Sequence, residues 1–302
     1  FMTAPSLLYA YAVVSLPEGS LAVVDHLQRA VGIDAAPVTF VGAATDAPAQ
    51  STAVLVSMVD GERYAPGEVE ARVGELEWLA PRAEAHDRVV TAAADATPTI
   101  PLPIFSLFRD EAAIRLMLVE RREELDRLFA RLRGAREYTV RVYRDDAKLN
   151  AALSDLSPHI RELEGDAARA SPGQRYLLQR KLDEARRAEL KRASGTIAME
   201  TYRALSPVAR AAVREPLPAA LASVGEGGTS TQPAILNASF LVDDARLDEF
   251  RRALSDVIAL RSPAGFHVDF TGPWPAYHFA RETGGPDDVA GAAAPDRGSA
   301  NG

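Results

Sequence analysis

A strand that runs into two prolines near the C-terminal end most strongly limits what this chain can fold into. Between residues 266 and 271 apolar and polar side chains alternate, which is the period of a half-buried strand. Pro273 and Pro275 then fix their own φ angles, lack the N–H that a sheet ladder needs, and push the preceding residues toward extended backbone. We therefore expect a stiff platform directly after the strand. It carries three aromatic side chains: Trp274, Tyr277 and Phe279.

Two roles are open for this platform. Large aromatic side chains are usually buried, so Trp274 would close the end of a core beside Phe266 and Phe270. Alternatively, Trp274 and Tyr277 bind a partner protein, because aromatic side chains often dominate the binding energy of an interface. For Trp274 we favour the core, since the preceding strand delivers its ring beside the two phenylalanines.

Composition excludes several classes of protein. The 302 residues fit two domains of about 150 residues each. The absence of cysteine excludes disulfides and Cys-based metal sites and is typical of a reducing cytosol. A formal charge of −8 disfavours nucleic-acid binding, which depends on phosphate neutralisation. The chain has no signal-peptide pattern and no apolar run of about 18 residues, so we expect a soluble, cytoplasmic protein without a membrane span.

The first part of the chain predicts a mixed α+β domain over residues 2–134. Residues 7–14 are apolar at almost every position, as in a strand buried on both faces. Gly134 is a typical helix terminator and marks the expected domain boundary. Further extended segments are expected at residues 38–43, 53–59 and 97–108, and helices at residues 68–94, where Pro81 kinks or divides the helix, and 110–132.

The second part predicts an elaborated ferredoxin-like domain over residues 135–280. Its pattern of strand, helices, strand, helix and strand is typical of an α+β sheet with helices on one face. Ser171 followed by Pro172 predicts the start of a long helix, residues 172–205. Residues 281–302 are rich in Gly, Ala and Asp and lack aromatic side chains, so we expect a disordered tail.

The long helix is basic although the chain is acidic. Residues 175–192 hold seven basic and three acidic side chains. They form either a solvated face held by pairs such as Asp183 with Arg187, or a docking surface for an acidic partner. The candidate docking residues are Arg175, Arg180, Arg186 and Arg187.

No catalytic or cofactor motif is recognised. The five histidines are scattered without a metal-ligand spacing, and no phosphate loop is present. We therefore predict no metal, no cofactor and no catalytic residue. The competing class is a small-molecule enzyme or ligand-binding module on a ferredoxin-like α+β fold. An enzyme would need a deep pocket on which polar groups converge, such as His86, Arg141 or His267.

Five segments, taken in order, resemble the gas vesicle protein F and L family. Residues 271–279 are similar to its C-terminal signature Thr-Gly-Pro-Trp-Pro-Pro-Tyr-x-Phe, with Ala276 in place of the third proline. Ile104 and Ser106 stand where the family commonly has Arg and Gly. The other similar segments are residues 8–14, residues 86–90 with 100–105, residues 171–177 and residues 236–242.

The resemblance implies a non-enzymatic protein of the gas vesicle, a gas-filled protein shell that gives prokaryotic cells buoyancy. Members are minor components or assembly factors that bind the small hydrophobic shell protein, gas vesicle protein A, and other gas vesicle accessory proteins. The expected location is therefore the cytoplasm and the gas vesicle. The resemblance does not separate the F type from the L type, and it does not identify the surface that meets the shell protein.

Overall fold

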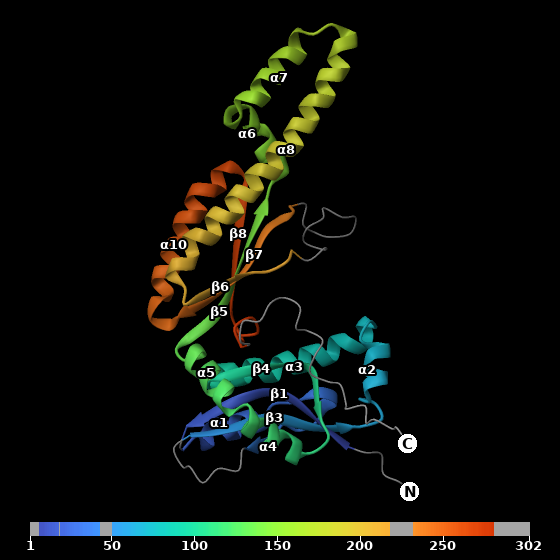
Figure 1. The fold of residues 1–302 in the computed structure, drawn as a ribbon, viewed down its shortest axis with the longest axis vertical. Helices are drawn as coiled ribbons and strands as arrows, with labels where there is room; N and C mark the ends of the chain where they lie inside the picture. Colours follow the sequence, from blue (N-terminus) through green and yellow to red (C-terminus); the bar gives the residue numbers. More distant parts are fainter. Residues whose placement is uncertain (1–5, 18, 43–49, 218–231, 281–302) are drawn as a thin grey trace, which may run out of the picture.

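Two four-stranded antiparallel sheets organise the chain (Figure 1). The computed structural model describes residues 6–17, 19–42, 50–217 and 232–280. The strand order is β2-β3-β1-β4 in the N-terminal sheet and β6-β7-β5-β8 in the C-terminal sheet. The predicted α+β class is confirmed. The predicted tail, residues 281–302, lies outside the described residues.

The N-terminal sheet has helices on both faces. β1 is one of its two central strands, and residues 9–14 of the predicted apolar run are buried, whereas Leu7 and Leu8 are half-buried. Helices α1 and α3 cover one face, and α4 and α5 cover the other. The elements are β1 (Ser6–Pro17), α1 (Leu21–Gln28), the 3-10 turn η1 (Ile33–Ala35), β2 (Thr39–Gly42), β3 (Gln50–Asp60), α2 (Pro66–Arg72), α3 (Leu76–Ala96), β4 (Thr99–Phe108), α4 (Glu111–Glu120) and α5 (Arg122–Leu132). α3 continues through Pro81, so the helical region divides before α3 and not at the proline.

The C-terminal sheet has its helices on one face, as predicted. Its apolar side packs against α8 and α10. The strand β6 was not predicted, because four residues give too short a pattern to recognise. The elements are β5 (Ala135–Arg144), α6 (Asp146–Leu156), α7 (Pro158–Arg169), α8 (Pro172–Leu205), η2 (Ser206–Val208), β6 (Ala211–Arg214), β7 (Ala234–Asp243), η3 (Asp244–Arg246), α10 (Leu247–Arg261), η4 (Ser262–Ala264) and β8 (Phe266–Trp274).

Both sheets share one topology. With the helices α6 and α7 set aside, the C-terminal elements follow the order β-α-β-β-α-β, and the spatial strand order 2-3-1-4 is ferredoxin-like. With α2 set aside, the N-terminal elements from β1 to β4 follow the same order in sequence and in space. The N-terminal half, predicted only as a mixed α+β domain, is therefore ferredoxin-like as well.

The long helix α8 begins and ends where it was predicted. Ser171 and Gln174 form a capping box at its start, where Oε1 of Gln174 accepts from the backbone N–H and the hydroxyl of Ser171. With 34 residues at a rise of about 1.5 Å each, α8 is about 50 Å long. Figure 1 shows that its first half extends beyond the sheet, together with α6 and α7. We call this projecting part, residues 146–189, the helical arm.

The two halves share a hydrophobic cluster. Phe279, which is 2% exposed, and Leu241 belong to the C-terminal half by sequence. Both pack in one cluster with Ile114, Leu118 and Leu128 from the helices of the N-terminal half. Because the core is continuous across the predicted boundary, the division into domains 2–134 and 135–280 stays a prediction.

Gly272 sets the path of β8 and gives a test of the fold. Its φ of +122° favours glycine, and a Cβ there would lie 2.9 Å from the carbonyl oxygen of Glu137 and 3.0 Å from Cδ1 of Tyr138. We predict that Gly272→Ala lowers the free energy of unfolding by about 1–3 kcal/mol in urea denaturation. The matched control is Gly195→Ala in α8, where a Cβ meets nothing within 4 Å and helix propensity should raise that free energy by up to about 1 kcal/mol. Equal effects of the two substitutions would contradict this account of Gly272.

Candidate functional site

The segment that follows β8, residues 275–280, joins the two halves of the molecule. In Figure 1 it leaves the red end of β8 and lies beside α3. The ring of Tyr277 packs against the core on the α3 face of the N-terminal sheet, and its hydroxyl donates to Oδ1 of Asp87 at 3.1 Å. Burial raises the pKa of Tyr277. Tyr277, a candidate for partner binding, therefore makes its hydrogen bond within the molecule.

His278 links two carboxylates of the C-terminal sheet. Its Nδ1 lies 2.6 Å from Oε1 of Glu137, and its Nε2 lies 3.2 Å from Oε2 of Glu215. Its backbone N–H also donates to Oε2 of Glu137 at 3.1 Å. The hydrogen bonds to Glu137 and then to Glu215 outweigh burial and raise the pKa of His278 to about 10. The imidazole is therefore a cation at neutral pH, and both ring nitrogens are donors.

A polar network surrounds this link on the side of the sheet that faces away from α8. Glu215 accepts hydrogen bonds from Ser239 and from Nδ2 of Asn237, the latter at 3.1 Å. Asn237 in turn accepts from Nε of Arg141 at 3.1 Å. Burial would raise the pKa of Glu215, but its hydrogen bonds with His278 and Ser239 prevail and lower it. The network holds β5, β6, β7 and the segment after β8 together.

Trp274 is not a core residue. The side chain is 46% exposed, and its Nε1 donates to Oγ1 of Thr271 at 3.3 Å. The pairing of β8 with β5 shifts by one residue before the tryptophan, so that Glu137 faces Trp274 and Thr139 faces Thr271. This shift moves Trp274 from the face of Phe270 to the opposite face. The prediction that Trp274 fills the core beside Phe270 is wrong.

Trp274 lines a cleft between the two halves, with a volume of about 270 Å³. One wall is the end of α3 with the turn into β4, and the other is the link from α5 to β5. Three prolines, which hold the backbone rigid, share this lining: Pro98, Pro273 and Pro275. We call this recess the junction cleft.

The four candidate arginines of α8 have different roles. Arg186 pairs with Glu164 of α7, with 2.7 Å between Nη2 and Oε1, and so holds the helical arm together. Arg175 donates to the carbonyl oxygen of Ala170 at 3.3 Å. Arg180 and Arg187 are exposed, and neither has an ion pair with another described residue. Arg186 therefore stabilises the arm, whereas the other three remain available to a partner.

The residues proposed for an enzyme do not converge. His86 is buried in the N-terminal half, where its Nδ1 lies 2.8 Å from the hydroxyl of Tyr9, and burial lowers its pKa to about 4. Arg141 and His267 lie on the C-terminal sheet, where His267 bonds to Asp269 at 2.8 Å. The structure therefore places the three side chains at two separate sites.

Within the described ranges of the chain, no group of three or more His, Cys, Asp or Glu side chains is placed to hold a metal ion. None of the helices described there is long and apolar enough to cross a membrane.

Two solved structures share the fold of this chain. The crystal structure of the gas vesicle protein GvpF from Anabaena sp. PCC7120 superposes with a TM-score of 0.60 over 92% of this chain and 98% of that chain, at 17% identity. GvpF from Microcystis aeruginosa superposes with a TM-score of 0.57 over 91% and 99%, also at 17% identity. At this level of identity the similarity shows the fold alone.

Sequence comparison shows the family. The model of the gas vesicle synthesis protein GvpL/GvpF family matches residues 7–281. Gas vesicle protein L of Streptomyces sp. (strain CB03234) is 31% identical over 215 residues, which cover 70% of this chain and 73% of that protein. Gas vesicle protein L1 of Halobacterium salinarum is 29% identical over 204 residues, or 66% and 70%. The chain belongs to the GvpL/GvpF family, as its motifs indicated, and this membership supports a role in gas vesicle assembly.

The link between Glu137, Glu215 and His278 was not predicted from the sequence. The alternation along β5 indicates one polar face, with Glu137, Thr139 and Arg141 on it. It does not indicate the partner of Glu137, because His278 lies 141 residues away in the chain. The polar face could have been predicted, but the link that closes it could not.

The raised pKa of His278 predicts a specific pH dependence of stability. Because the folded pKa of about 10 exceeds the unfolded value, the contribution of His278 is fully present below about pH 6.5 and is lost as the pH rises through 10. The side chain is 40% exposed, so screening limits this contribution to about 1–2 kcal/mol. We expect His278→Gln to lower the free energy of unfolding at pH 6 by that amount, and the difference from wild type to shrink toward pH 10.

Tyr277→Phe is the matched control for this experiment. It removes the neighbouring hydrogen bond to Asp87 without removing a charge, so its effect should be the same at pH 6 and pH 9. Urea denaturation at several pH values measures both variants. A His278→Gln effect that stays constant between pH 6 and pH 10 would show that the imidazolium does not provide the link.

Proposed function

We propose that this protein is a non-enzymatic accessory or minor structural protein of the gas vesicle. It binds the hydrophobic shell protein, gas vesicle protein A, and other gas vesicle accessory proteins during assembly. It acts in the cytoplasm and at the gas vesicle. Membership of the GvpL/GvpF family supports the assembly role, and the exposed ring of Trp274 in the junction cleft supports contact with an apolar side chain of the partner.

The exposed ring of Trp274 is the observation that carries this proposal. Its Nε1 is already engaged by Thr271, so the surface offered to a partner is the apolar face of the indole. Pro273 and Pro275 fix the backbone on both sides of the ring. A preordered aromatic side chain loses little conformational entropy when it binds, and this favours a role as an interface anchor.

Binding at this cleft would give the protein a protective role. An apolar shell subunit tends to aggregate before it is incorporated, because exposed apolar patches associate in water. This protein has a net charge of −8. When it covers the apolar patch of a shell subunit, charge repulsion keeps one complex from associating with another. The alternative function, a small-molecule enzyme or ligand-binding module, has less support because His86, Arg141 and His267 do not converge.

Substitution of Trp274 tests the proposal. We expect Trp274→Ala to weaken binding of gas vesicle protein A by about 2 kcal/mol, roughly 30-fold, and to change the melting temperature by less than about 3 °C. Trp274→Phe should retain most of the binding, because it keeps an aromatic face. The measurement is the amount of gas vesicle protein A that co-purifies with the tagged protein when both are co-expressed.

Leu260→Ala provides the matched control. Leu260 is an apolar side chain that is 65% exposed on α10, away from the junction cleft, so its loss should leave co-purification unchanged. If Trp274→Ala folds normally and still retains gas vesicle protein A at the wild-type level, the cleft is not the binding site. Early melting of Trp274→Ala would instead indicate that the ring stabilises the fold.

A further inference from the structure

The outer half of α8 presents one side that no other described element covers. Between residues 172 and 181 no side chain is buried. The helix packs there against α6 and α7, and in Figure 1 the helical arm projects away from both sheets. Leu178 and Leu182 turn toward the packed side, and Leu182 is only 4% exposed, in a cluster with Ile160 of α7. The opposite side of this half of α8 therefore faces away from the rest of the arm.

Cations and an aromatic side chain gather on that opposite side. Arg180, Arg187 and Lys191 lie four, eleven and fifteen residues after Tyr176. At 3.6 residues per turn these spacings place all four side chains within about 60° of one another. Tyr176 is 68% exposed, and its neighbour Leu177 is 60% exposed. We call this set the arm stripe: Tyr176, Arg180, Arg187 and Lys191.

The cations of the arm stripe make no ion pair within the described residues, although Asp183 and Glu184 lie between Arg180 and Arg187 in the sequence. Of the seven basic side chains between residues 175 and 192, Arg186 pairs with Glu164 and Arg192 with Glu189. The remaining five are exposed and have no ion pair with another described residue: Arg175, Arg180, Lys181, Arg187 and Lys191. The excess of basic side chains on this helix creates a local positive potential. The net charge of the whole chain, in contrast, is −8.

We propose that the arm stripe is a second docking surface and that its partner is an acidic protein segment with an apolar side chain beside its carboxylates. Arginine binds carboxylates in a bidentate geometry, and Tyr176 offers an aromatic anchor next to them. From Tyr176 to Lys191 the stripe is about 22 Å long, so a helical segment of about 15 residues spans it. The proposal concerns a different surface and a different partner chemistry from the junction cleft, and it does not rest on binding of the shell protein.

A nucleic acid is the less suitable occupant. Its affinity depends on neutralising many phosphates at once, and the net charge of −8 repels a polyanion as it approaches. An acidic protein segment needs only a few ion pairs, and it fills the apolar part of the surface at Tyr176 and Leu177. A basic surface with an aromatic anchor at one end therefore favours a short acidic segment over a nucleic acid.

Charge reversal on the stripe tests the proposal. The probe is a fluorescein-labelled helical peptide of about 16 residues in which Glu surrounds a ridge of Leu, titrated with the full-length protein by fluorescence anisotropy. We expect the double variant Arg180→Glu, Arg187→Glu to weaken binding at least about tenfold, and Tyr176→Ala about fivefold. Raising the salt concentration to about 0.5 M should weaken wild-type binding in the same direction.

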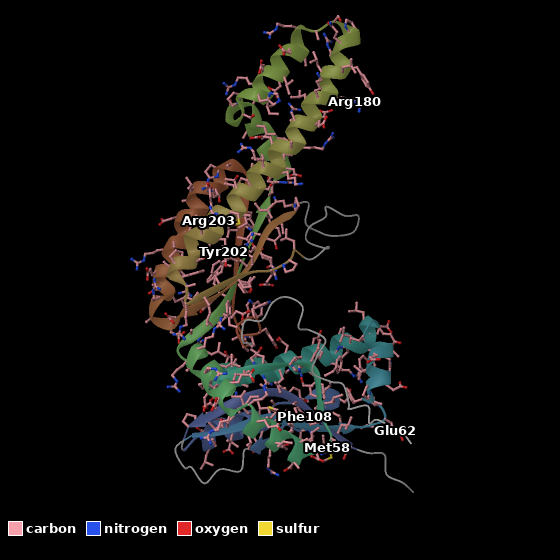
Figure 2. The ribbon with its side chains drawn as sticks, in the orientation of Figure 1. Met58, Glu62, Phe108, Arg180, Tyr202 and Arg203 are labelled. Atoms are coloured by element: carbon pink, nitrogen blue, oxygen red, sulfur yellow. The ribbon has the colours of Figure 1, made fainter. Side chains whose placement is uncertain are left out.

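Two controls make the result specific. Arg203→Glu reverses one charge in the same helix, about 35 Å from Arg180, and should alter binding less than about twofold; Figure 2 labels both positions. Trp274→Ala should bind the peptide like the wild type. A result that contradicts the arm stripe can therefore be distinguished from one that contradicts the junction cleft. Circular dichroism and melting temperature confirm that each variant folds.

Three results would overturn the proposal. One is equal peptide affinity of the Arg180→Glu, Arg187→Glu variant and the Arg203→Glu control. The second is binding of a Lys-for-Glu version of the peptide as tightly as the acidic one. The third is binding of a short DNA duplex more tightly than the peptide, with loss of that binding on charge reversal, which would assign the stripe to nucleic acid.

Discussion

The ion pairs that His278 makes with Glu137 and Glu215 anchor the segment that joins the two halves. Glu137 is 2% exposed, and an ionised carboxylate in such surroundings is costly unless a cation and hydrogen bonds compensate it. His278 provides both. Because it lies between Tyr277 and Phe279, the same link also fixes the ring that contacts the core beside α3 and the ring that enters the cluster of α4 and α5. One imidazole therefore orders a segment that reaches both faces of the N-terminal sheet.

Much of the fold follows from patterns that a single sequence carries. The apolar run of β1 predicted a strand buried on both faces, and Ser171 with Pro172 predicted the first turn of α8. The shared topology of the two sheets was not predictable in the same way. The segment of β2 was predicted as extended, but β6 has only four residues, too few to show a period, and without it the C-terminal half does not display its complete order of elements.

The two errors at the candidate site have different physical causes. Trp274 was assigned to the core because strict alternation places it on the face of Phe270, but a shift of one residue in pairing reverses the face. A glycine followed by a proline inside a strand often marks such an irregularity, so Gly272 and Pro273 were an available signal. The link at His278 gave no local signal. Its partners are distant in sequence, and only the folded chain brings them together.

The two proposed surfaces differ in chemistry and in position, and that difference suits an assembly factor. The junction cleft offers an apolar ring between the halves, whereas the arm stripe offers cations on a helix that projects beyond the C-terminal sheet. α8 runs without interruption from the arm into the packed core, so it holds the stripe at a fixed separation from the sheet. A protein that binds an apolar subunit at one surface and an acidic partner at the other raises the effective concentration of each for the other. A rigid connection strengthens this effect, because the separation between the bound partners is set by a helix and not by a flexible linker.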